Sequence, residues 1–157
     1  MEIYIDADAC PVKDEVYKVA ARYGLKTFVV SNAPIMIPRS PLITRVVVAA
    51  GPDMADDWIA AHVTAGDVVI TSDIPLAERV LQAGAQALAP NGKRFDENSI
   101  GNAIAQRALM EQLRSTGAVL GGPKPFDRTD RSRFLQALDT VIQHQRRRQP
   151  AGTPPGS

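Results

Sequence analysis

A chain of 157 residues with 45% hydrophobic and 22% charged residues has the composition of one ordinary globular domain, which excludes an intrinsically disordered protein. The formal net charge of +1 gives no overall field that would attract nucleic acid or a membrane surface. The single cysteine, Cys10, excludes an internal disulfide and a cysteine-rich zinc site. The sequence shows no signal-peptide pattern after Met1 and no apolar run long enough to span a bilayer, so we expect a cytoplasmic protein without a membrane partner.

Apolar runs alternate with amphipathic segments along the first 95 residues. Strands are predicted over residues 2–6, 27–31, 44–51, 68–71 and 85–89. Helices are predicted over residues 11–23, 53–63 and 75–83. Nearly continuous apolar strands that alternate with helices are typical of a parallel sheet covered on both faces. We therefore predict an α/β fold, a three-layer α/β/α sandwich with a mostly parallel central sheet.

Beyond residue 95 the pattern becomes helical. Further helices are predicted over residues 98–115 and 130–145, joined by the Gly/Pro-rich segment GAVLGGPKPF. The final segment, RRRQPAGTPPGS, has no apolar face. Its composition predicts a disordered tail over residues 146–157, which leaves a single domain over residues 1–145.

Carboxylates follow three of the predicted strands. Asp6 and Asp8 come at the end of the first strand, and Asp73 directly follows the strand over residues 68–71. A third group, in the segment GPDMADDWI, contains Asp53, Asp56 and Asp57. Ligands of open parallel sheets bind beyond the carboxyl ends of the strands, so these acids are expected to converge at one edge. The alternative is that each acid caps a helix, which fits Asp53 and Asp73 but leaves the Asp6 and Asp8 pair unexplained.

Carboxylates gathered at one edge repel each other unless a cation neutralises them. Oxygen ligands without a cysteine or histidine cluster suit Mg²⁺ or Mn²⁺. The candidate metal ligands and catalytic residues are Asp6, Asp8, Asp73 and one of the pair Asp56 and Asp57. Such an ion leaves room for substrate phosphate and can activate a water, which points to hydrolysis of a phosphodiester.

Basic side chains near strand ends are candidates for contacts with substrate phosphates. Lys13 lies in the first predicted helix, and Lys93 and Arg94 follow the fifth predicted strand. The run at residues 146–148 either strengthens non-specific nucleic-acid binding or only solvates the tail. Cys10 is interpreted as a small packing residue beside the acids.

Four ordered segments, DADACPVK, GPDMADDWI, VVITSDIPLA and PNGKRFDENSIGNAIAQRALMEQLR, together resemble the YaiI/YqxD family of uncharacterised bacterial proteins (DUF188) over roughly residues 1–140. That family resembles a divergent branch of the PIN-like nuclease fold, a compact α/β/α sandwich. The resemblance implies Mg²⁺ or Mn²⁺ held by acids at strand ends, and cleavage of nucleic acid, with RNA favoured over DNA.

Site residues are carried over by position from the same resemblance. It implies site roles for Asp6, Asp56 and Asp73, with Asp57 competing with Asp56, and makes Asp8 particular to this branch. Ser72 is the small hydroxyl residue before the acid of TSD and is a candidate for contacting substrate. The counterpart of a further residue that closes the site is Asp96, Glu97 or Asn98, of which Asn98 is also a candidate for contacting substrate.

Two other functions remain open beside a nuclease. In a phosphatase of the haloacid-dehalogenase type, the D-x-D of DADA would supply Asp6 as nucleophile and Asp8 as acid and base. Such enzymes need a later G-D-x-x-x-D motif, which the sequence lacks after VVITSD. The other alternative is a non-catalytic module that binds nucleic acid or protein and carries a vestigial acidic site.

Overall fold

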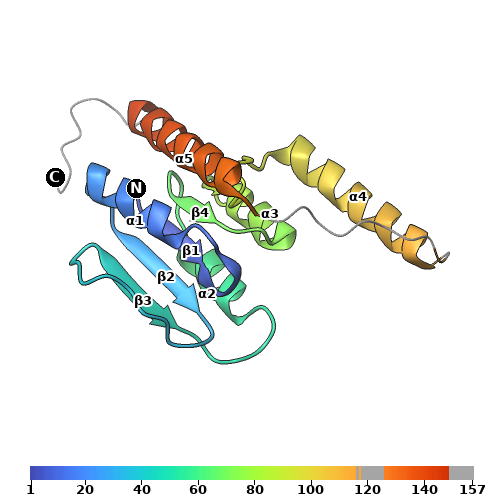
Figure 1. Cartoon of the computed structure of the whole chain (residues 1–157), viewed down its shortest axis with the longest axis horizontal. Coiled ribbons are helices and arrows are strands. Elements are labelled where there is room, and N and C mark those ends of the chain that lie inside the picture. Colours follow the sequence, from blue (N-terminus) through green and yellow to red (C-terminus); the bar gives the residue numbers. More distant parts are fainter. Residues whose placement is uncertain (116, 118–125, 149–157) are drawn as a thin grey trace.

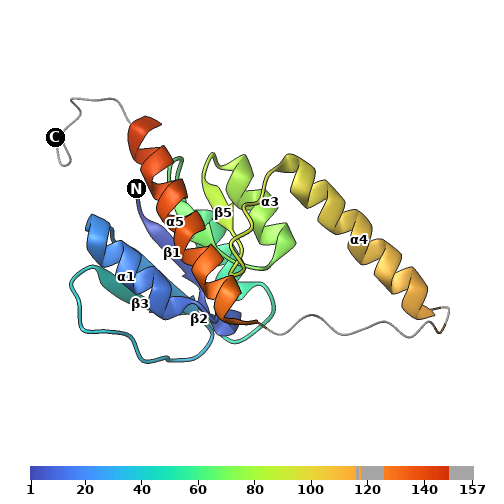
Figure 2. The same ribbon diagram turned by 45° about the horizontal axis from the view of Figure 1, so that its top comes forward.

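The computed structural model describes residues 1–115, 117 and 126–148 of the chain. In this part of the chain a five-stranded sheet contains β1 (Ile3–Asp6), β2 (Thr27–Ser31), β3 (Ile43–Val47), β4 (Val68–Ile70) and β5 (Gln86–Leu88). The strand order is β3-β2-β1-β4-β5, and every neighbouring pair is parallel (Figures 1 and 2). The predicted α/β fold is confirmed, with an all-parallel sheet.

The direction in which the chain adds strands reverses between β1 and β4. From β1 the chain moves outward through β2 to the edge strand β3, and it then crosses back to place β4 on the other side of β1. In open parallel sheets, the crevice at such a reversal is the usual place for a ligand.

Helices cover both faces of the sheet. They are α1 (Lys13–Tyr23), α2 (Met54–His62), α3 (Ile74–Gln82), α4 (Glu97–Ser115) and α5 (Arg128–Arg148), with a short 3-10 helix, η1 (Ala7–Ala9). Alternate residues of each strand point to opposite faces, so Ile3 and Ile5 pack under α1 and α5, whereas Tyr4 packs under α2 and α3. Phe134 of α5, the largest of the fully buried side chains among the described residues, belongs to the first of these two cores.

Helix α4 joins the second of these cores through Ile100 in its first turn, and the rest of the helix lies outside both layers. Both overall views show it projecting away from the sheet, and the element it packs on is α3 (Figures 1 and 2). Its side chains Ile104 and Leu109 are 49% and 54% exposed. None of the described helices is long and apolar enough to cross a membrane.

Several elements end elsewhere than predicted, for identifiable reasons. The third strand was predicted over residues 44–51 but ends at Val47, because β2, the strand beside it in the described sheet, ends at Ser31. The first helix begins at Lys13 rather than Pro11, because η1 occupies the chain after β1. The last helix continues to Arg148, so residues 146–148 are helical and not part of the predicted tail. Residues 149–157 and most of the predicted Gly/Pro linker lie outside the described residues.

Candidate functional site

The reversal between β1 and β4 brings the first two acids to one place. Asp6 is the last residue of β1, and Asp73 follows β4 by a short turn. The register pairs Ile5 with Ile70, so the next residues along the two strands, Asp6 and Thr71, lie opposite each other at the carboxyl edge.

Thr71 connects these two acids directly. Its side chain is only 2% exposed, and its Oγ1 donates a hydrogen bond of 2.9 Å to Oδ2 of Asp6. The same Oγ1 accepts a hydrogen bond of 3.0 Å from the backbone N–H of Asp73. Position in the sequence had drawn attention to the exposed hydroxyl of Ser72, but the buried hydroxyl one residue earlier is the one that holds Asp6. The register of adjacent parallel strands was the signal that could have identified it.

Asp73 caps a helix and also faces other acids. Its Oδ1 accepts a hydrogen bond of 2.8 Å from the backbone N–H of Leu76, so the cap interpretation is confirmed for this residue. It is not confirmed for Asp53, which precedes α2 in a left-handed conformation (φ 65°) and makes no side-chain capping bond. A cap engages one carboxylate oxygen, so capping leaves Asp73 able to contribute to a site.

Asp56, in the first turn of α2, is the third member of the group. Its pKa is raised to about 6, first by burial and then by the negative charges of Asp73, Asp6 and Asp53 and a side-chain hydrogen bond with Asp73. The adjacent Asp57 instead pairs with Arg79 of α3, with 2.7 Å between Oδ1 and the guanidinium. Of the two acids that the sequence left as alternatives, Asp56 is therefore the one that faces the carboxyl edge of the sheet. We call Asp6, Asp56 and Asp73 the acid cluster.

The pKa of Asp6 is raised for the same physical reasons. Burial raises the pKa of its carboxyl group, as do the charges of Asp73 and Asp8, and only the hydrogen bond from Thr71 acts in the other direction. Two of the three members of the acid cluster therefore resist ionisation. A bound cation would offset their negative charges.

Asp8 lies at the margin of the acid cluster. It is exposed in η1, and its two carboxylate oxygens lie 3.2 and 3.0 Å from the backbone nitrogen of Asn32, which donates to them. Its charge reaches Asp6, but its carboxylate is bonded to the chain just beyond β2. The structure therefore joins Asp8 to the acid cluster through charge rather than through a shared hydrogen bond.

The donor atoms fit a hard cation, although they do not form a complete cage. Within the described ranges, no group of three or more His, Cys, Asp and Glu side chains is arranged to hold a metal ion. Mg²⁺ does not require such a cage, because it keeps several waters and usually takes one or two protein carboxylates together with substrate phosphate. Thr71 engages Oδ2 of Asp6, so Oδ1 of that residue could take such a role, and Asp73 and Asp56 could contribute the oxygens that they share in their hydrogen bond.

The predicted basic contacts are distributed around the same edge. Nζ of Lys13 donates to the backbone carbonyls of Cys10 (3.0 Å) and Ala7 (3.4 Å), so it supports the loop that carries Asp8. Lys93 and Arg94 are exposed in the turn after β5.

The segment considered for a closing residue forms the start of α4. Asp96 accepts a hydrogen bond of 2.7 Å from the N–H of Ser99, and its own N–H donates to Oγ of Ser99 at 2.8 Å. This reciprocal pair makes Asp96 a helix cap. Asn98 is exposed in the first turn of the helix.

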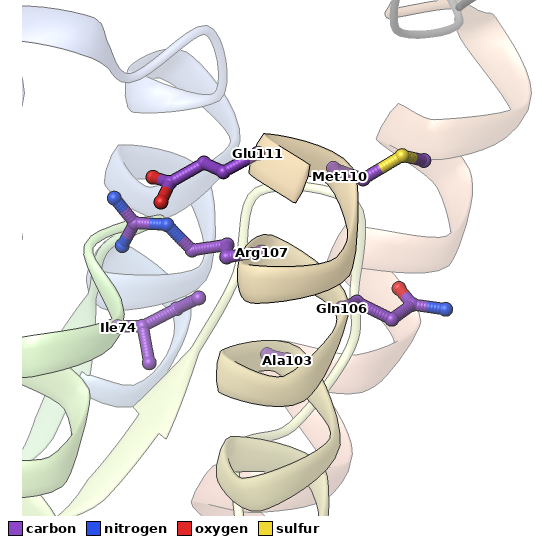
Figure 3. A pocket seen from close by; sticks show the side chains of 6 residues that line it. All are labelled: Ile74, Ala103, Gln106, Arg107, Met110 and Glu111. Carbon is purple, nitrogen blue, oxygen red and sulfur yellow. The ribbon is translucent and has the colours of Figure 1, made fainter. Parts of the chain in front are cut away.

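Two depressions adjoin the residues on either side of Asp73. The first, which we call the Phe126 depression, has a volume of about 450 Å³ and includes Ser72, Asn91 and Phe126 in its lining. The second, the Ile74 depression, has a volume of about 370 Å³ and lies between α3 and α4. In Figure 3, Arg107 and Glu111 extend to the same side as Ile74.

Comparison with known proteins identifies the family to which the chain belongs. A model of the uncharacterised bacterial YaiI/YqxD family matches residues 4–144. A UPF0178 protein of Caulobacter sp. (strain K31) is 63% identical over 145 residues, which cover 92% of this chain and 96% of that protein. UPF0178 proteins of Azorhizobium caulinodans and of Rhodopseudomonas palustris (strain BisB5) are 61% and 58% identical and cover 89% and 93% of this chain, and 88% and 89% of their own lengths. No solved structure matches the chain. The chain therefore belongs to the uncharacterised bacterial YaiI/YqxD (UPF0178) family.

Proposed function

We propose that the chain is a metal-dependent nuclease that uses Mg²⁺ or Mn²⁺ to hydrolyse phosphodiester bonds, with RNA as the favoured substrate. The observation that carries this proposal is the acid cluster, in which three carboxylates from three separate segments share the carboxyl edge at the reversal point of the sheet. Three mutually repelling acids at this position are hard to explain by packing or capping alone. A PIN-like fold is part of the same proposal, supported by a parallel sheet with acids at its carboxyl edge.

Each side chain has a role in this proposal. Asp6 and Asp73 would hold the ion, Asp56 would complete the negative surface, and Asp8 would add charge at its margin. When bound, the ion would offset charge on the phosphate and lower the pKa of a water. Thr71 fixes the orientation of Asp6, and the cap on α3 fixes Asp73, so both carboxylates are held before substrate arrives. The N-terminus of α3, which follows Asp73, carries a partial positive charge that favours an anionic substrate nearby.

The electrostatics favour this proposal over a non-catalytic module. In a vestigial site, the acid cluster would keep its mutual repulsion with no ligand to offset it. Helix capping does not explain the cluster either, because a cap needs only one acid at each helix. The phosphatase alternative needs Asp8 free to act as acid and base beside Asp6. The carboxylate of Asp8 is instead bonded to the backbone of Asn32.

A cleavage assay with matched variants tests the proposal. A labelled single-stranded RNA is incubated at about pH 7.5 with Mg²⁺ or Mn²⁺, with and without EDTA. Cleavage is expected only with metal, and it should disappear in Asp6→Asn and Asp73→Asn. The second variant keeps a good capping side chain, so its defect would not reflect loss of the helix. Asp57→Asn removes the same charge one residue from Asp56 and should cleave normally.

Three results would contradict the proposal. They are cleavage that resists EDTA, cleavage that persists in Asp6→Asn, and phosphate release from p-nitrophenyl phosphate without any cleavage of RNA. The last of these would support the phosphatase alternative instead.

A further inference from the structure

The Phe126 depression adjoins the chain segment that leads into Asp73 of the acid cluster. Its walls come from four segments that are distant in sequence: the loop before α1, the turn after β4, the turn after β5, and the start of α5. Ser72, which lines it, immediately precedes Asp73. A substrate whose phosphate lay at the acid cluster would therefore have this depression as a neighbour.

Hydrogen bonds fix two of these walls to each other. The guanidinium of Arg131 donates to the carbonyl of Pro11 at 2.8 Å and to Glu15 at 3.1 Å, which ties the start of α5 to the loop before α1. The same guanidinium lies 5.0 Å from the centre of the Phe126 ring. The aromatic side of the depression is therefore held in place without a ligand.

The turn after β5 is fixed to α5 by close packing. A Cβ added to Gly92 would lie 2.9 Å from the backbone carbonyl of Arg133, so the two segments approach as closely as a glycine allows. Asp127 and Asp130 exchange backbone-to-carboxylate hydrogen bonds of 2.9 and 3.1 Å at the start of α5. The Phe126 depression is therefore preformed, a property that reduces the entropy lost on binding.

The chemistry of the lining suits a planar, polar heterocycle. Phe126 and the prolines Pro11 and Pro90 supply an aromatic ring and apolar walls. Oδ1 of Asn91 accepts a hydrogen bond of 3.0 Å from the N–H of Lys93, which leaves the amide NH₂ to donate. Oδ2 of Asp130 accepts from Asp127, which leaves Oδ1 as an acceptor. An apolar pocket with a few placed donors and acceptors is the usual form of a small-molecule site.

We propose that the Phe126 depression binds the nucleobase of the nucleotide next to the scissile phosphate, a role that rests on the proposed nuclease function. Phe126 provides the surface against which a base stacks, because every base has a π-face. Asn91 donates to an acceptor on the edge of the base, and Asp130 accepts from a donor on that edge. The depression therefore makes the enzyme prefer some bases at this position over others.

The Ile74 depression is the less suitable of the two for a base. Its lining comes from α4 and a single residue of α3 (Figure 3), and α4 projects from the body of the protein (Figures 1 and 2). None of the described residues that line it has an aromatic ring. Substitutions in the Ile74 depression therefore serve as controls for nucleoside binding.

The test uses free nucleosides, so that binding is measured without metal or cleavage. Adenosine, guanosine, cytidine and uridine are titrated in EDTA and followed by protein NMR, with inorganic phosphate as a further probe. At least one nucleoside should shift the signals of Asn91 and Phe126, and phosphate alone should not.

Variants locate the contact. Asn91→Asp keeps the acceptor for Lys93 but removes the donors, and it should weaken nucleoside binding by about tenfold. Phe126→Leu keeps an apolar side chain but removes the aromatic face and should also weaken binding. Asn102→Asp, on the exposed side of α4, adds the same charge as Asn91→Asp and should bind normally. Gln106→Glu makes the matching change in the Ile74 depression and should also bind normally.

The outcomes separate this inference from the proposed function. Nucleoside binding that survives in Asp6→Asn but is weakened in Asn91→Asp supports the base site, whether or not RNA is cleaved. The inference is overturned if no nucleoside binds, if Asn91→Asp binds as the unaltered protein does, or if Gln106→Glu is the variant that weakens binding.

Discussion

Thr71 donates a hydrogen bond of 2.9 Å to Asp6 across the boundary between β4 and β1, the two strands at which the sheet reverses direction. The same hydroxyl accepts from the backbone N–H of Asp73. One buried side chain therefore links two of the three acids. The acid cluster depends on this residue as well as on the carboxylates themselves.

Replacement of Thr71 should affect both stability and activity. Thr71→Val keeps the shape but leaves Oδ2 of Asp6 and the N–H of Asp73 without their partner, which should lower the free energy of unfolding by about 1–3 kcal/mol. The hydrogen bond from Thr71 lowers the pKa of Asp6, so its loss should raise that pKa. The acidic limb of the pH–rate profile should therefore move to higher pH. Thr71→Ser should restore both properties. Denaturant unfolding and cleavage rates across pH check this, and equal behaviour of the Val and Ser variants would contradict it.

The raised pKa of Asp56 predicts how stability depends on pH. The folded value is about 6, and the ordinary value is 3.8. Between these values the folded protein binds more protons than the unfolded chain, so the free energy of unfolding should fall as pH rises from about 4 to about 6. Asp56→Asn should reduce this fall and should be more stable than the unaltered protein above about pH 6.

Thermal unfolding across pH measures this effect, and Asp57→Asn is the control. That variant loses only an exposed ion pair with Arg79, which contributes less than about 1 kcal/mol. Its pH dependence should therefore match that of the unaltered protein. If stability falls with pH in the same way in Asp56→Asn and in the unaltered protein, ionisation of Asp56 does not destabilise the folded state.

Divalent metal should stabilise the protein in a way that depends on pH. A cation that binds only the folded state raises Tm, and protonation of Asp56 removes negative charge that favours its binding. The rise in Tm with Mn²⁺ or Mg²⁺ should therefore be large at about pH 7.5 and small at about pH 5. It should be absent in Asp6→Asn. An equal rise in that variant, or a larger rise at the lower pH, would place the metal elsewhere.

The close approach of Gly92 to α5 predicts a steric effect on stability. Gly92→Ala would force a side chain into a left-handed conformation (φ 91°) and against the backbone of Arg133. It should lower the free energy of unfolding by more than about 1 kcal/mol. Gly101→Ala, in α4 with nothing within 4 Å of the added Cβ, should instead raise it by up to about 1 kcal/mol. Chemical denaturation compares the two, and similar values for both variants would refute the packing argument.

Much of the fold follows from local patterns in the sequence. The apolar runs at residues 27–31 and 68–71 predict strands because parallel strands are buried on both faces. The end of the third strand could not be predicted, because the chain stops pairing where β2 ends and not where its own apolar run ends. The extent of α5 also depends on tertiary contacts, since Arg146 lies 5.2 Å from the ring centre of Tyr23 in α1.

The site was predictable in outline for the same reason. Strand ends predict that Asp6 and Asp73 meet, because parallel strands end at one edge. The choice between Asp56 and Asp57 depends on side-chain directions in a helical turn and on the position of Arg79, which the local pattern does not specify. The contribution of Thr71 depends on strand register, and the Phe126 depression depends on how α5 returns to the sheet.

The most direct test of the acid cluster is a crystal structure of the protein soaked in Mn²⁺, with anomalous diffraction to locate the ion. We expect an anomalous peak within coordination distance of carboxylate oxygens of Asp6 and Asp73, with Asp56 facing it, and no such peak in crystals of Asp6→Asn. Crystals that show no peak there, or carboxylates that turn away from one another toward solvent, would contradict the central claim.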